Sequence, residues 1–102
     1  MVTILRYELN DAINDLELPI GYEVLKVGTK FDNDGIERIC IWCKVDVDLN
    51  RLPGMTEHVR FLVYGTGANM DELTTFPNRY LGTTQLKHNS LHALHIFEVL
   101  KK

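Results

Sequence analysis

The two cysteines of the chain have the spacing of a redox or zinc motif, Cys40-Ile41-Trp42-Cys43. A redox pair needs a thiolate stabilised at a helix N-terminus, and a structural zinc ion normally needs four ligands. This pair lies instead inside an apolar run typical of a strand, where a spacing of three residues directs the two side chains to opposite faces. We therefore expect two buried structural cysteines.

Three histidines, His88, His92 and His95, have the spacing that places side chains on one face of a helix. On a helix they would suggest a metal site, and a metal-dependent phosphodiesterase would be the enzymatic interpretation. On a strand His92 and His95 face opposite ways, and Glu98 is the nearest acid. Residues 91–100 fit either element by propensity, but the compact turn before them favours a strand. We therefore expect no bound metal and no cofactor.

The segment Tyr64-Gly65-Thr66-Gly67 resembles a phosphate-binding loop in its glycine content. It lacks the lysine ending of a P-loop and the third glycine of a dinucleotide fingerprint, so a strand end with glycines at positive φ is the simpler interpretation. Its backbone N–H groups could still bind an anion.

Asp32-Asn33-Asp34-Gly35 begins like a calcium loop, but Cys43 stands where that loop requires glutamate, so we expect a tight turn. No nucleophile elbow or carboxylate pair indicates an enzyme.

What remains is a set of side chains suited to a flat, phosphorylated ligand. Arginine pairs with phosphate, and aromatic rings stack on nucleobases. The strand end at Tyr64-Gly65-Thr66-Gly67, together with Arg60, would present a guanidinium, a ring, a hydroxyl and backbone donors to one ligand. Other candidate contacts on predicted strands are Arg6, Trp42, Tyr80, Gln85 and His92. Taken singly, each of these residues is more often core or interface packing.

Alternating or continuous apolar runs separated by turn residues predict six strands. These cover residues 3–9, 22–27, 36–47, 58–66, 78–86 and 91–100. Residues 10–18 are polar and indicate a turn, with at most one loose helical turn, and residues 68–77 form a connection. The Asp32-Asn33-Asp34-Gly35 turn predicts a hairpin between the second and third strands.

Short strands at this spacing predict a mainly β fold, a compact antiparallel sandwich or small barrel that forms a single domain over residues 1–102. The third and sixth strands are apolar on both faces, although a sheet of a small monomer normally keeps one face polar. Either two sheets enclose a core or an apolar face continues into a subunit contact. We expect a homo-oligomer.

The composition is that of an ordinary globular domain, with 45% hydrophobic and 25% charged residues. The net charge is −3, and eleven basic residues scattered among fourteen acidic ones form no stripe that would bind a polynucleotide. No apolar run is long enough to span a membrane, and the first residues lack the pattern of a signal peptide. Two cysteines are too few for a disulfide framework, so we expect a cytoplasmic location.

Short motifs follow one another along nearly the whole chain. They are Leu5-Arg6-Tyr7-Glu8-Leu9, Leu18-Pro19 with Gly21 and Val24-Leu25, Ile41-Trp42 with Val45-Asp46, Arg60-Phe61 with Tyr64-Gly65-Thr66-Gly67, Tyr80-Leu81-Gly82-Thr83 with Gln85-Leu86, and His95-Ile96-Phe97-Glu98-Val99. This pattern resembles a family of small uncharacterised domains common in bacteriophages. The last motif forms a strand in that family, and no functional residues are established for it, so the resemblance transfers none.

The resemblance implies a phage protein, and a compact phage protein without enzyme motifs suggests a role against host defence. Phages encode oligomeric "sponges" that sequester the cyclic-nucleotide signals of immune systems such as CBASS. The sequence is compatible with that class, and we hypothesise that the protein binds a cyclic dinucleotide in the host cytoplasm without cleaving it. The alternative is a structural or protein-interaction accessory domain that docks through an apolar sheet face or an exposed edge.

Overall fold

The computed structural model describes residues 1–87 and 89–100 of the chain. These residues contain seven strands: β1 (Val2–Glu8), β2 (Ile13–Pro19), β3 (Glu23–Phe31), β4 (Glu37–Asp46), β5 (Thr56–Gly65), β6 (Asn78–Leu86) and β7 (Asn89–Val99). Two short 3₁₀ helices, η1 (Val47–Arg51) and η2 (Leu73–Thr75), lie in the connections before and after β5. In the part of the chain described, no helix is long and apolar enough to cross a membrane.

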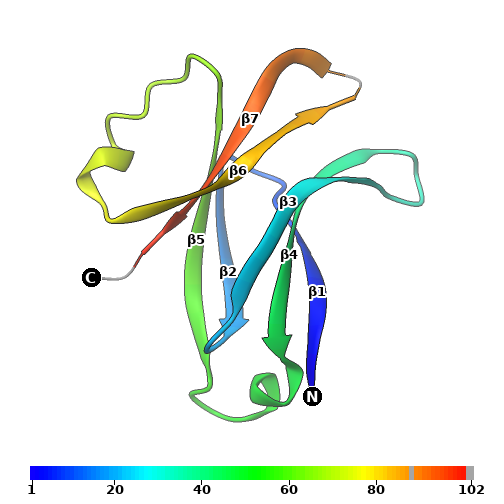
Figure 1. The fold of residues 1–102 in the computed structure, drawn as a ribbon, viewed down its shortest axis with the longest axis vertical. Helices are drawn as coiled ribbons and strands as arrows, with labels where there is room; N and C mark the ends of the chain where they lie inside the picture. The colour runs from blue at the N-terminus through cyan, green and yellow to red at the C-terminus, as the bar shows by residue number, and fades with distance from the viewer. Residues whose placement is uncertain (88, 101–102) are drawn as a thin grey trace.

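The strands form two antiparallel sheets (Figure 1). One sheet has three strands in the order β1-β4-β3, and the other has four in the order β2-β5-β7-β6. Strands β3 and β6 lie side by side where the two sheets meet (Figure 1). The predicted mainly β, antiparallel, compact architecture is therefore confirmed.

The core lies between the two sheets and draws alternate residues from each, as strand geometry requires. Its buried members are Leu9, Leu18, Ile39, Ile41, Cys43, Val45, Val59, Phe61 and Ile96. Cys40 and Cys43 are both free and buried. Cys43 belongs to this core, whereas Cys40 points to the opposite face of β4, so the expectation of two structural cysteines on opposite faces is confirmed.

The predicted hairpin joins β3 to β4. Its turn is held by Asp32, whose Oδ1 accepts hydrogen bonds from the backbone N–H groups of Asp34 and Ile36, each at 2.9 Å. Gly35 follows with a φ of 76°, a conformation that favours glycine. The final segment is also a strand, as expected, because β7 is central in its sheet, between β5 and β6.

The expectation of a turn over residues 10–18 is wrong, because most of them belong to strand β2. The alternation of apolar and polar residues that predicts a strand is broken here, because the polar residue Asn14 takes an inward position and is only 7% exposed. Its side chain donates to the carbonyl oxygen of Asp11 at 2.7 Å and accepts from the N–H of the same residue at 3.1 Å. Leu18 supplies the apolar contact that anchors β2 to the core.

Candidate functional site

The outer face of the four-stranded sheet carries the residues that alternate with the core residues along its strands. On this face Tyr64 of β5 pairs with His95 of β7, and His95 pairs in turn with Thr83 of β6. Side chains directly opposite one another on one face of an antiparallel sheet are close enough to interact. These three residues form one row across three strands, which we call the Tyr64–His95–Thr83 row.

A chain of hydrogen bonds connects this row to the turn that follows β5. His95 Nδ1 lies 2.9 Å from Thr83 Oγ1, and His95 Nε2 lies 2.9 Å from Thr66 Oγ1. The hydroxyl of Thr83 also bonds to the hydroxyl of Tyr80. In a neutral imidazole one ring nitrogen donates and the other accepts, so His95 links β6 to the glycine turn through two threonine hydroxyls.

Three aromatic rings flank the hydrogen-bonded residues. The ring of Phe97 lies between those of Tyr64, at a centroid distance of 6.0 Å and an interplanar angle of 75°, and Tyr80, at 5.3 Å and 50°. Such edge and tilted contacts are the arrangements that aromatic pairs prefer, and they hold the rings in place. Tyr80 is 53% exposed, so part of its ring is available to a planar ligand.

A β-bulge in β6 places Tyr80 and Thr83 on the same face. In a regular strand, residues three apart point to opposite faces. The register of β6 against β7 shifts between Tyr80 and Gly82, and Gly82 has a φ of 156°. Sequence reasoning therefore selected Tyr80 but missed Thr83, and considered His95 only as a metal ligand. Gly82 was the one local signal of the bulge.

Some of the backbone N–H groups in the turn after β5 are already hydrogen-bonded to carbonyl oxygens of the protein itself. The backbone N–H of Thr66 donates to the carbonyl oxygen of Ala93 at 3.1 Å, and Gly67 has a φ of 89°. The N–H of Ala68 donates to the carbonyl oxygen of Gly65 at 3.0 Å. The hydroxyl of Thr66 also donates to the carbonyl oxygen of Ala93, at the longer distance of 3.4 Å, and because this hydroxyl is exposed it is the donor most readily released to an incoming anion.

Arg60 lies farther along the outer face of β5 and is held by Asp15 of β2. The guanidinium makes a bidentate contact, with Nε 2.8 Å from Asp15 Oδ1 and Nη2 3.1 Å from Oδ2. These hydrogen bonds hold the pKa of the Asp15 carboxyl below its usual value. A phosphate bound by Arg60 would have to compete with this carboxylate.

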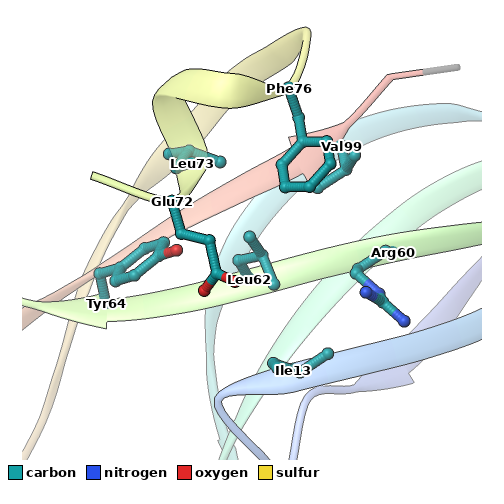
Figure 2. A pocket seen from close by; sticks show the side chains of 8 residues that line it. All are labelled: Ile13, Arg60, Leu62, Tyr64, Glu72, Leu73, Phe76 and Val99. Carbon is teal, nitrogen blue, oxygen red and sulfur yellow. The ribbon is translucent and has the colours of Figure 1, made fainter. Parts of the chain in front are cut away.

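Arg60 and Tyr64 line the same pocket, which has a volume of about 140 Å³ (Figure 2). Leu62 lies between them on the floor, and Glu72 and Phe76 come from the connection between β5 and β6. The remaining lining residues are Ile13, Leu73 and Val99. Figure 2 shows the carboxylate of Glu72 reaching toward Leu62, and the guanidinium of Arg60 is already paired with Asp15, so the pocket is mainly apolar with charged groups of both signs at its rim, which suits a ring better than a phosphate.

Trp42 does not join these residues, because it lies on the outer face of the other sheet. There it stands in register between Arg6 of β1 and Lys26 of β3. Lys26 Nζ lies 5.3 Å from the centroid of the Trp42 ring, within the range of a cation–π contact. The ring also covers Gly28, whose missing Cβ would lie 3.3 Å from it.

The remaining residues that were predicted to contact a ligand do not belong to the Tyr64–His95–Thr83 row. Gln85 is an exposed residue of β6 beyond Thr83. His88 and the side chain of His92 lie outside the described residues, so the possible metal face of three histidines is not placed. Across the described ranges, no three side chains of His, Cys, Asp or Glu are grouped so that they could hold a metal ion.

A family model described as a domain of unknown function, DUF7352, matches residues 1–102. No curated protein and no solved structure matches the chain. Three of the motifs in the sequence, Tyr64-Gly65-Thr66-Gly67, Tyr80-Leu81-Gly82-Thr83 and His95-Ile96-Phe97-Glu98-Val99, are far apart along the chain but meet around the Tyr64–His95–Thr83 row.

Proposed function

Because the chain belongs to the DUF7352 family, whose description assigns no function, we propose one from its own surface: the protein binds a small phosphorylated nucleotide on the outer face of the four-stranded sheet. One observation carries this proposal. The Tyr64–His95–Thr83 row is joined by hydrogen bonds to Thr66 and Tyr80 and is flanked by aromatic rings, so hydroxyl, imidazole and ring surfaces converge at one place.

The rings of Tyr64 and Tyr80 supply the stacking surface for a base. Stacking of a base on an aromatic side chain contributes about 1–3 kcal/mol. In a neutral imidazole one ring nitrogen accepts the proton of one threonine hydroxyl, and the other nitrogen donates to the second threonine, whose own proton can then turn toward a phosphate oxygen. A ligand that spans ring and hydroxyls therefore uses groups that the fold already holds in position.

The arrangement favours retention of the ligand over its cleavage. Both ring nitrogens of His95 are hydrogen-bonded to threonine hydroxyls, so the imidazole positions side chains on two strands. A general base would instead need one nitrogen directed at an attacking group. Sequestration needs only tight, reversible binding, and a row fixed by its own hydrogen bonds lowers the cost of ordering the site.

The ligand that we favour is a cyclic dinucleotide immune signal. It carries two bases and two phosphates in a compact shape, which matches the exposed ring of Tyr80 and the half-buried ring of Tyr64 close to hydroxyl donors. Together with the resemblance to a bacteriophage family, this chemistry supports a phage protein that counters host defence by sequestering the signal in the host cytoplasm.

Self-association would extend this surface. Three apolar side chains around the outer face, Ile13, Phe76 and Tyr80, are 57%, 46% and 53% exposed. Exposed apolar groups gathered around a pocket are typical of surfaces that contact another molecule. A second copy of the chain on this face would cover them and enclose a ligand.

The proposal is tested by incubating the protein with a panel of cyclic oligonucleotides, removing unbound ligand, and releasing what is retained by heat. Mass spectrometry then identifies the released species. Intact ligand is the expected result. Cleaved product would show an enzyme instead, and no retention would favour the accessory-domain alternative.

Substitutions then locate the site. His95→Gln should weaken binding about tenfold or more, because it breaks the link between Thr66 and Thr83. The control is His58→Gln, at an exposed histidine farther along β5, which should leave binding unchanged. Thr66→Ala should weaken binding by about fivefold. Arg60→Ala should weaken it by about tenfold to a hundredfold if the guanidinium leaves Asp15 for the phosphate. Unchanged affinity in all three site variants would move the site to the Trp42 surface.

The accessory-domain alternative rests on a different surface. Strand β1 is an edge strand, and its outward residues Val2 and Ile4 are 63% and 56% exposed. An exposed apolar edge can pair with a strand of another protein. A Val2→Lys, Ile4→Lys double variant should leave nucleotide retention intact and abolish only such pairing.

A further inference from the structure

A buried carboxylate with an unused oxygen lies on the inner face of the four-stranded sheet. Glu98 of β7 is 4% exposed and pairs with Phe61 of β5 and Arg79 of β6. Its Oε2 accepts the hydrogen bond of the Tyr22 hydroxyl. Its Oε1 is buried and has no hydrogen-bond partner within the described ranges. A buried carboxylate oxygen without a donor costs free energy, so this place in the fold requires a further group.

A pocket of about 180 Å³ lies beside this carboxylate. Its lining residues are Tyr22, Glu57, His58, Val59, Glu98, Val99 and Leu100. His58 is exposed, so the pocket reaches the surface at that residue. The volume is large enough for a small organic molecule or for several water molecules.

Two of the polar side chains that line the pocket with Glu98, those of Tyr22 and Glu57, present hydrogen-bond acceptors to it, and the third, His58, lies at the surface. Tyr22 donates its only hydroxyl proton to Glu98, which leaves the lone pairs of its oxygen free to accept. Burial, followed by the hydrogen bond to Glu98, raises the pKa of Tyr22, so the hydroxyl stays protonated. Glu57 adds a second carboxylate to the lining. A group that completes this pocket must therefore donate a hydrogen bond to Glu98 Oε1, and two carboxylates in the lining favour a group with positive charge.

Arg79 is the cation that stands opposite Glu98 in the register of β6 and β7, but it does not complete the site. It is exposed, and its charge only partly opposes the rise that burial causes in the pKa of Tyr22. Its guanidinium makes no hydrogen bond to Glu98 Oε1. A metal ion is also disfavoured, because the described residues hold no cluster of three His, Cys, Asp or Glu side chains suited to one.

We infer that this pocket binds the primary ammonium group of a small aliphatic amine. An ammonium group has three donors and no acceptor, which matches Glu98 Oε1, the Tyr22 oxygen and the Glu57 carboxylate. The aliphatic stem lies against apolar lining residues, Val59, Val99 and Leu100. Glu98 and Val59 face the inner side of β7 and β5, away from the Tyr64–His95–Thr83 row, so the ammonium group and the nucleotide would contact different polar side chains, although Val99 lines both pockets.

The test uses n-butylammonium chloride as the probe, with n-butanol and sodium butyrate at matched ionic strength as controls. Binding is followed by NMR through the backbone amide shifts around Glu98 and Tyr22. The ammonium compound alone should produce saturable shifts there. Glu98→Gln keeps the size of the side chain and an acceptor for Tyr22, and it should weaken binding at least tenfold. Glu72→Gln, at an acid of the outer pocket, should not change it.

Several outcomes would overturn the inference. One is the absence of saturable shifts with n-butylammonium, because Oε1 would then be satisfied by water or by Arg79 in solution. Equal binding of n-butanol would reduce the site to an apolar cavity. If Glu98→Gln binds n-butylammonium as tightly as the wild type does, the Glu98 carboxylate is not part of the binding site. If Glu98→Gln does not fold, Tyr22→Phe takes its place, and unchanged affinity in that variant is equally decisive.

Discussion

Replacing Gly82 with alanine should destabilise the protein, because Gly82 lies where the two sheets touch. A Cβ at this position would lie 2.5 Å from Cγ2 of Val27 on β3, far inside van der Waals contact. The backbone adds a second cost, since its φ of 156° is one that residues with a Cβ rarely adopt. Both costs arise from the bulge that also positions Tyr80 and Thr83 at the candidate site.

The size of the effect follows from these two terms. Forcing an extra methyl group into a packed contact costs about 1–3 kcal/mol. Holding a non-glycine residue in a sparsely populated backbone region costs about 1–3 kcal/mol. The free energy of unfolding should therefore fall by about 2–6 kcal/mol, which is a large part of the roughly 5–15 kcal/mol that stabilises a typical domain.

Urea unfolding of a double-mutant cycle separates the two terms. Val27→Ala removes the atom that the new Cβ would meet, so Gly82→Ala should cost about 1–3 kcal/mol less in the Val27→Ala background than in the wild type. Gly65→Ala is the matched control, because it lies in a strand of the same sheet, has no positive φ, and a Cβ there would meet nothing within 4 Å. It should change stability by less than about 1 kcal/mol.

Two results would refute this reasoning. If Gly82→Ala unfolds at the same urea concentration as the wild type, the backbone and the contact at Gly82 are not as described. If its cost is the same in both backgrounds, Val27 is not the residue that the new methyl group meets. A destabilised Gly82→Ala that remains folded should also lose nucleotide binding, because the bulge sets the position of Thr83 beside His95.

Other measurements address the remaining features. Burial raises the pKa of the Cys43 thiol to about 12 and raises that of Cys40, so a thiol reagent at pH 8 should label neither cysteine until urea is added, and labelling of the folded protein would contradict their burial. The backbone N–H of Ile36, followed by Arg38, lowers the pKa of Asp32, so its contribution to stability is present above the unfolded pKa and is lost as the pH falls through the lower folded value. Asp32→Ala should therefore be less stable at pH 7 but should lose less stability on acidification, and parallel acid-unfolding curves would disprove this. Light scattering at micromolar concentration should give a multiple of the 11.7 kDa chain mass, and a monomer mass would rule out self-association.

Local patterns in the sequence determined most of the strands and one turn. Side chains in a strand alternate with a period of two, so the run that contains Cys40 and Cys43 was sufficient to predict a strand with the cysteines on opposite faces. The turn that begins at Asp32 was predicted equally well, because its hydrogen bonds join residues only two and four positions apart. Both features depend on neighbours in the chain.

Apart from the β3–β4 hairpin, the tertiary structure alone decided which strands pair, in which register and in which sheet. Strand β2 was missed because Asn14 is satisfied inside the fold, where alternation requires an apolar residue. Trp42 and Tyr64 were grouped as possible contacts, yet their strands belong to different sheets. His95 meets Thr66 and Thr83 because β7 pairs with both β5 and β6, and because a bulge shifts β6 against it. The register of a strand is set by its pairing with segments that are distant in the sequence. The pattern of residues along one strand therefore does not predict that register.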